Sequence, residues 1–151
     1  MALSGDELIA AARAIAQRAH DGQTDKAGEP YIGHPLRVAA RVHTAEQKAV
    51  ALLHDVLEDT AVTAEDLLAE RIPADVVAGV IAMTKPPGTT NYADAIARAA
   101  ADPLARVVKA ADIADNSDEA RLSRLAPEQA DRLRRKYAEG RQLLEDATRN
   151  Q

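Results

Sequence analysis

The spacing of apolar residues along the chain predicts a series of amphipathic helices. Apolar side chains recur at intervals of three and four over residues 8–19, and Ser4, just before this run, has the short polar side chain that caps helices. A second run with the same periodicity extends from Thr44 or Ala45 to about Asp59. We therefore expect both runs to be continuous helices.

Residues that favour helix starts divide the rest of the chain. They are Pro35, Thr63 with Asp66, Pro73, Asn91, Asp102 with Pro103, and Pro127. The stretch before His34 is instead rich in Gly and Pro, which predicts an ordered loop that leads into a helix. Since no segment alternates with the period of a strand, the pattern predicts an all-α protein of about seven or eight helices.

Size and composition narrow the class of protein. A chain of 151 residues suits a single domain, 1–151, with one main core. It has no Phe or Trp and a net charge of −5, which argues against stacking on nucleic acid and against long-range attraction to anionic membranes. The absence of Cys excludes thiolate metal ligands, and neither a targeting segment nor an apolar run of roughly 18 residues is evident. We expect a soluble, cytoplasmic protein.

One polar quartet stands out within ALLHDVLEDT. At about 100° per residue, His54, Asp55, Glu58 and Asp59 share one face of the predicted helix, opposite a stripe of core residues. Such a face can simply be solvated. A neighbouring His and Asp can also ligate one metal ion, and two further carboxylates nearby could orient or deprotonate a bound water and protonate a leaving oxygen.

A second polar cluster lies in VVKAADIADN, where Asp112 and Asn116 are one helical turn apart. Taken alone, Asp112 could equally be a cap or the partner of a core arginine. Lys26, in the Gly-rich loop, is near a possible anion site, although most isolated lysines are merely exposed. His20 and His43 have no comparable partner, so we interpret both as surface or packing residues.

Together, AHDGQTDKAGEPYIGHPLRVA, ALLHDVLEDT and VVKAADIADN resemble the successive motifs of HD-superfamily hydrolases of the RelA/SpoT type. The resemblance extends from about residue 20 to residue 116, and it is greatest to the small alarmone hydrolases. These are all-helical HD domains that remove the 3′-pyrophosphate of ppGpp. The resemblance implies one divalent ion, Mn²⁺ by family preference, and a set of four metal ligands. These are His34, His54, Asp55 and Asp112.

The resemblance also assigns roles around the ion. It implies that Glu58 and Asp59 are the catalytic carboxylates, and that Lys26, Asn116 and Tyr137 contact the substrate. For Tyr137, helix packing is an equal alternative.

Two departures concern recognition of the base. The family commonly has Arg-Lys where this chain has Asp25-Lys26, and the segment IADNSDEARL around Asn116 is less basic and less aromatic than usual. The sequence therefore leaves open hydrolysis of another nucleotide, such as an adenine alarmone or NADPH, and a non-catalytic nucleotide sensor. The partner expected is a small-molecule nucleotide, and no oligomeric state is predicted.

Overall fold

The computed structural model describes residues 2–86, 88 and 91–150, and within them the chain is helical, with no strand. The helices are α1 (Gly5–Ala19), α2 (Gly33–Ala40), α3 (Ala45–Leu53), α4 (Val56–Asp59), α5 (Ala64–Ala69), α6 (Ala74–Ala82), α7 (Tyr92–Ala100), α8 (Pro103–Asn116), α9 (Glu119–Leu122) and α10 (Pro127–Arg149). The all-α prediction is confirmed. The helices exceed the predicted number because α4 and α9 have only four residues each, too few to produce a periodic pattern.

The predicted helix starts are confirmed. Ser4 accepts a hydrogen bond from the backbone N–H of Glu7 at 3.2 Å, and the Glu7 side chain accepts from the backbone N–H of Ser4 at 2.9 Å. Asn91 and Asp102 each accept two backbone N–H groups at the starts of α7 and α8. These caps satisfy amides that have no acceptor within the helix.

The prediction of one continuous helix over 45–59 is wrong. α3 ends at Leu53, and His54 and Asp55 form a turn before α4 begins. The ring Nδ1–H of His54 donates to the carbonyl oxygen of Ala51 at 2.6 Å. That oxygen is the acceptor that the backbone amide of Asp55 would use in a continuous α-helix, so the side chain competes with the helix at this point. The polar quartet is thus divided between a turn and a short helix.

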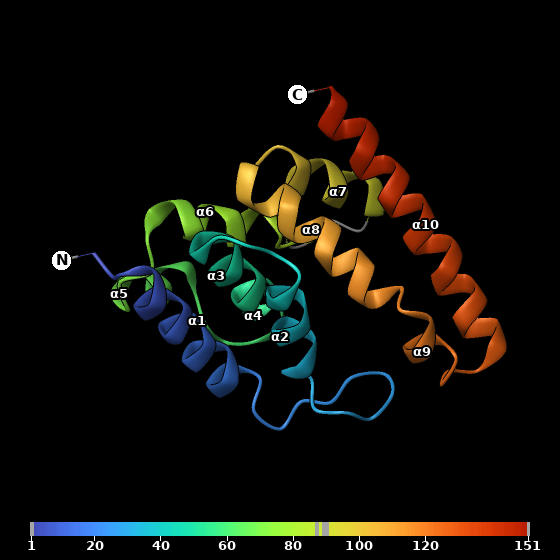
Figure 1. Ribbon diagram of the computed structural model, residues 1–151, viewed down its shortest axis with the longest axis horizontal. Coiled ribbons are helices and arrows are strands. Elements are labelled where there is room, and N and C mark those ends of the chain that lie inside the picture. The colour runs from blue at the N-terminus through green and yellow to red at the C-terminus, as the bar shows by residue number, and fades with distance from the viewer. Residues whose placement is uncertain (1, 87, 89–90, 151) are drawn as a thin grey trace.

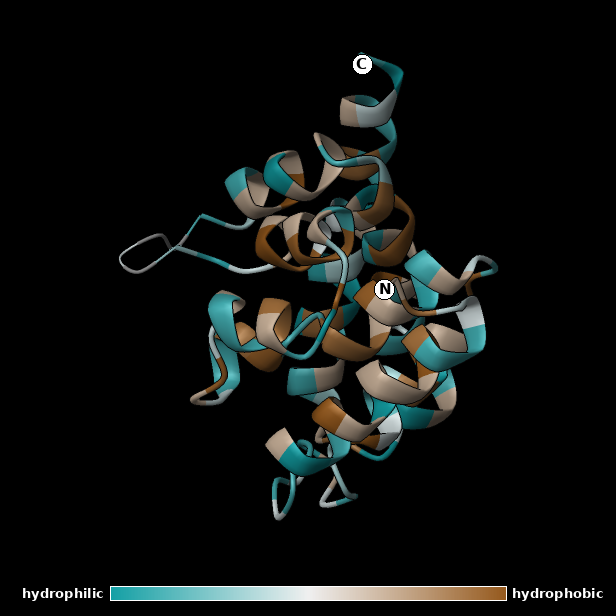
Figure 2. Cartoon of the chain, turned by 90° about the vertical axis from the view of Figure 1, so that its left-hand side faces the viewer, coloured by the Kyte–Doolittle hydropathy of each residue, from teal (hydrophilic) through white to brown (hydrophobic). Residues whose placement is uncertain are grey.

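Two groups of helices meet along α8. The main core is built by α1, α2, α3, α6 and one side of α8, while α7 and α10 cover the other side of α8 with a smaller apolar cluster. Figure 1 shows α8 crossing the middle of the molecule, with α10 lying along its outer side. Figure 2 colours the cartoon by residue hydropathy, and brown, apolar residues gather toward the middle of the molecule. This arrangement brings α8 against the ends of α2 and α3.

Close packing of α10 on α7 depends on Gly140. A Cβ atom at this position would overlap the ring of Tyr92, so the absence of a side chain allows the two helices to approach. The contact fixes Tyr92 and the neighbouring Tyr137 on one wall of the region described next.

Candidate metal centre

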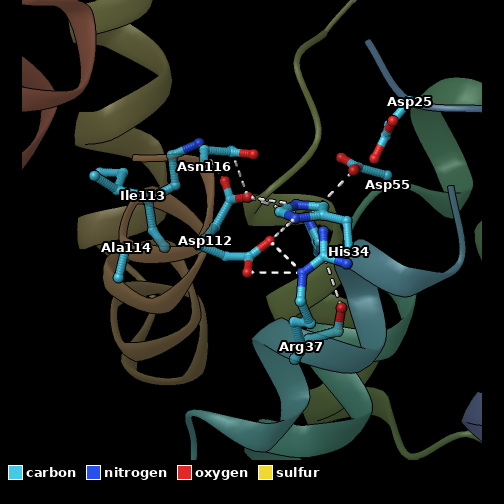
Figure 3. Close-up of polar contacts among 12 residues, drawn as sticks. Asp25, His34, Arg37, Asp55, Asp112, Ile113, Ala114 and Asn116 are labelled. Carbon is cyan, nitrogen blue, oxygen red and sulfur yellow. Dashed lines mark hydrogen bonds and ion pairs between the residues drawn. The ribbon is translucent and has the colours of Figure 1, made fainter. Parts of the chain in front are cut away.

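Three buried side chains from separate parts of the chain converge beside α8. His34 lies in the first turn of α2, His54 directly follows α3, and Asp112 lies on α8. The Nε2 atoms of His34 and His54 are 2.9 Å and 3.5 Å from the same oxygen, Oδ1 of Asp112. One ligand atom from each of the three lies within 4.8 Å of the others, which is close enough to share one metal ion. Figure 3 shows His34 and Asp112 pointing toward each other.

Asp55, the fourth predicted ligand, borders this group. Its Oδ2 lies 3.2 Å from Nε2 of His54, and the same oxygen accepts a hydrogen bond from the hydroxyl of Tyr31. The turn between α3 and α4 therefore points both His54 and Asp55 at the centre, although it breaks the helix on which they were predicted to lie.

The hydrogen bond made by the His54 ring indicates that a cation fits among these residues. Because the Ala51 carbonyl can only accept, Nδ1 carries a hydrogen, and in the neutral imidazole Nε2 then carries the lone pair. Nε2 is buried without a hydrogen-bond partner in the described structure, and it faces the carboxylates of Asp55 and Asp112. A lone pair opposite two carboxylates is unfavourable unless a cation lies among them. Two imidazoles and two carboxylates suit a divalent ion such as Mn, Fe or Zn.

The outer nitrogen of His34 is held by a second carboxylate. Nδ1 of His34 is 2.7 Å from Oδ2 of Asp115, which is 1% exposed, and Nε of Arg37 donates to both oxygens of Asp115 at 2.9 Å and 3.2 Å. A carboxylate behind a ligating histidine fixes the ring and its tautomer. The sequence reasoning missed Asp115 and Arg37. The available signal was the spacing of three residues between Asp112 and Asp115, which puts both on the face of α8 toward α2.

The charged groups of the centre have strongly shifted pKa values. Burial alone would lower the pKa of His34, but hydrogen bonds to Asp112 and Asp115 outweigh it and raise the pKa to about 9. Although burial would raise the pKa of Asp112, its hydrogen bond to His34 and the nearby positive charge of Lys109 hold it well below the ordinary value. Burial, together with the charges of Asp112 and Asp59, raises the pKa of Asp55 well above its ordinary value. These shifts reflect several carboxylates gathered around few positive charges.

Glu58 and Asp59 form a carboxylate group beside the centre. One oxygen of each lies within 4.8 Å of an oxygen of Asp55, and both side chains are exposed. Glu58 accepts the backbone N–H of Lys85 at 2.9 Å. Partial burial and the charge of Glu58 raise the pKa of Asp59. Both carboxylates are thus within reach of a water molecule near the centre.

A cavity of about 330 Å³ opens on one side of the centre. We call it the loop cavity, because residues 24–27 of the loop before α2 form one of its walls. Lys26, Asn116 and Tyr137, the three predicted substrate residues, all line it. Its lining also includes His34, Asp55 and Asp112 of the centre, and an apolar wall formed by Leu122, Leu125 and Leu133.

A smaller cavity of about 130 Å³, the cationic cavity, lies on the other side. Its lining includes the predicted ligands His54, Asp55 and Asp112 and the carboxylate Glu58. Four basic residues also line it, namely Lys85, Arg98, Lys109 and Lys136. Lys109 also lies 3.1 Å from Oδ2 of Asp112. Burial and the nearby charges of Lys85, Lys26 and Lys109 lower the pKa of Lys136. Four basic side chains thus line this cavity against three carboxylates, and this excess of basic groups in an acidic protein favours an anion.

Comparison with known proteins agrees with these features. The HD domain family model matches residues 12–138. The chain is 44% identical over 79 residues to the bifunctional (p)ppGpp synthase/hydrolase SpoT of Escherichia coli K12, an alignment that covers 47% of the chain and 11% of that protein. It is 38% identical over 121 residues to a guanosine-3′,5′-bis(diphosphate) 3′-pyrophosphohydrolase of Aquifex aeolicus, covering 73% of the chain and 17% of that protein. The chain thus spans a small part of these longer relatives.

A solved structure has the same fold. It belongs to a metazoan ortholog of SpoT described as hydrolyzing ppGpp, and it superposes with a TM-score of 0.71 at 23% identity, covering 95% of this chain and 94% of the other.

Among the described helices, none has both the length and the apolar character needed to cross a membrane.

Proposed function

Because the chain belongs to the HD-domain family, we propose that it is a metal-dependent phosphohydrolase that converts (p)ppGpp to GDP or GTP and pyrophosphate. The observation that carries this proposal is the position of the His and Asp cluster between two cavities of different chemistry. The names of the relatives in Escherichia coli and Aquifex aeolicus support the same substrate.

The two cavities suit a nucleotide that bears phosphates at both ends of its ribose. Asp55, Asp112, Asn116 and Tyr137 line both cavities, so one ligand can extend from one to the other across the centre. The apolar wall of the loop cavity suits the nucleoside, and the lysines of the cationic cavity suit the diphosphate that is not cleaved. The scissile phosphate would then lie beside His34, His54, Asp55 and Asp112.

In this proposal the four residues hold one divalent ion, Mn²⁺ in the first instance. Such an ion, when bound, polarises a phosphoryl oxygen and lowers the pKa of a coordinated water. Glu58 and Asp59 orient the attacking water, accept its proton and return a proton to the leaving group. The water oxygen bonds to the phosphorus attached to O3′ and the P–O3′ bond breaks, so the two phosphates are released together as pyrophosphate. The 3′ oxygen then leaves as a hydroxyl.

Lys26, Asn116 and Tyr137 would position the substrate. The Lys26 ammonium suits a phosphate oxygen, and the side chains of Asn116 and Tyr137 lie where the two cavities join. The Asn116 amide also donates to Oδ1 of Asp112 at 3.1 Å, so it connects the substrate region to the centre.

We also propose that the protein is cytoplasmic, a location that is consistent with a nucleotide substrate.

The direct test uses the purified protein with Mn²⁺ and ppGpp. Equal amounts of GDP and pyrophosphate should appear, and a chelator should stop the reaction. A preparation with bound metal that releases no pyrophosphate contradicts the substrate assignment. A panel with the adenine counterpart and NADPH tests the alternative substrates, and tight binding without turnover of any nucleotide would indicate a sensor.

A further inference from the structure

Asp25 lies in the loop before α2, at the position where the family commonly has an arginine. In the structure, Oδ1 of Asp25 accepts the backbone N–H groups of Ala27 and Glu29 at 2.9 Å and 3.0 Å. Its Oδ2 lies 3.6 Å from Nη2 of Arg121, and the carboxylate side chain is 9% exposed. The negative charge of Asp25 is therefore engaged by its own loop and by an arginine from α9.

Arg121 reaches the loop cavity from α9. Both Asp25 and Arg121 line this cavity, and the Arg121 side chain is 24% exposed. Among the described residues, Nε of Arg121 is buried and has no hydrogen-bond partner. The guanidinium is thus paired with Asp25 through Nη2, and Nε remains without a partner in a side chain that lines the cavity.

The surroundings of Arg121 suit a flat, apolar ring better than another phosphate. Leu122, Leu125, Leu133 and Tyr137 line the same cavity, and Leu122 and Leu133 are buried members of one apolar cluster. A guanidinium is planar and stacks on aromatic rings, and pairing with Asp25 offsets the positive charge that would favour phosphate. In this cavity a purine base could therefore contact the planar guanidinium of Arg121 and the aliphatic side chains of the leucines.

We propose that Arg121 binds the base of the nucleotide by stacking, and that Asp25 is a positioning residue that holds the guanidinium in place. This inference rests on the proposed function for the identity of the nucleotide. The acid at position 25 then preserves base recognition, because the cation that contacts the base comes from α9 and not from the loop.

The test combines kinetics with binding of the two products to the protein loaded with Mn²⁺. Arg121→Met should raise the KM for ppGpp on the order of tenfold, the scale expected for loss of one stacking contact, and change kcat by less than about threefold. It should weaken GDP binding by a similar factor and leave pyrophosphate binding within about twofold, because pyrophosphate has no base. Arg124→Met, an exposed arginine on the same segment, is the matched control and should resemble the wild type.

Two further variants separate stacking from charge and from stability. Arg121→Lys keeps the charge but lacks the planar face, so it should not restore the wild-type KM. Asp25→Asn keeps the oxygen that accepts the loop amides but removes the charge that holds Arg121, so it should raise KM by a smaller factor at unchanged melting temperature. Metal content and melting temperature are measured for every variant.

The outcomes distinguish this inference from the proposed function. If ppGpp is hydrolysed and Arg121→Met leaves KM and GDP binding unchanged, or if Arg121→Lys restores both, the stacking role is wrong while the proposed function stands. If the wild type does not hydrolyse ppGpp but binds GDP in a manner that depends on Arg121, the proposed substrate is wrong while the base site stands.

Discussion

The ring of His34 lies between two carboxylates of the same helix, with Nε2 2.9 Å from Asp112 and Nδ1 2.7 Å from Asp115. The two aspartates are three residues apart on α8, so both reach the buried ring from one side of the helix. Asp112 faces the centre, while Asp115 lies behind the ring and is itself paired with Arg37. This relationship explains why a residue that does not border the centre should affect metal binding.

Asp115→Asn should weaken metal binding. The substitution retains the size of the side chain but removes the charge that fixes the His34 ring, and loss of such a partner typically costs 10- to 100-fold in affinity. Titration of the metal-free protein with Mn²⁺ measures the effect. Asp131→Asn, an exposed aspartate on α10, is the control. Equal affinity of Asp115→Asn and the wild type would contradict the role given to Asp115.

The stability of the metal-free protein should fall as the pH rises from about 6.5 to 9. The pKa of His34 is raised to about 9 in the folded state, and a histidine in the unfolded chain titrates near 6.5. A raised folded pKa contributes stability that is fully present below the unfolded value and is lost as the pH rises through the folded value. Thermal melts in the presence of a chelator measure this loss.

The substitution His34→Gln provides the comparison for these melts. It should flatten the decline between pH 6.5 and 9, because the titrating group is gone, whereas the control His43→Gln should retain it. A decline of equal size in His34→Gln would show that another group causes it.

The sequence predicted most of the fold and the residues of the centre, for different reasons. Helix starts were predictable because caps such as Ser4 and Asp102 act within a few residues of the chain. The convergence of His34, His54 and Asp112 was anticipated through the motif resemblance alone, because the spacing of residues within one helix carries no information about which helices meet.

What could not be predicted depends on contacts between distant segments or on local competition. The break at His54 results from one ring hydrogen bond to Ala51, which the amphipathic pattern of the run conceals. The pairing of Asp25 with Arg121 joins residues 96 positions apart in the chain, so the acid at position 25 could be seen only as a departure from the family. The tight contact of Gly140 with Tyr92 likewise has no local signal.

Glu58→Gln and Asp59→Asn should each reduce kcat while leaving the metal content unchanged. Both carboxylates adjoin Asp55 without being grouped with His34, His54 and Asp112, so their loss should affect proton transfer more than metal binding. General acid–base groups typically contribute about 10²- to 10⁴-fold. Glu65→Gln, on the exposed face of α5, is the control. Loss of metal in parallel with activity would instead place the affected carboxylate among the ligands.

Lys136→Met should raise the KM for ppGpp on the order of three- to tenfold, because it removes one cation from the cationic cavity and charge-assisted contacts contribute roughly 1 kcal/mol or more. The Lys136 Nζ lies 4.9 Å from the centre of the Tyr92 ring, which holds the ammonium at the edge of the cavity. The effect should shrink at high salt, since the attraction is electrostatic. Arg135→Met, which removes the exposed cation next in the chain, controls for the loss of net charge.

An analogue that carries the 3′-pyrophosphate but no 5′-phosphate tests which phosphates occupy the cationic cavity. If the uncleaved diphosphate lies there, the KM for this analogue should be the same with the wild type and with Lys136→Met. A KM increase of the same size for that analogue would contradict this placement and assign Lys136 to the phosphate that is cleaved.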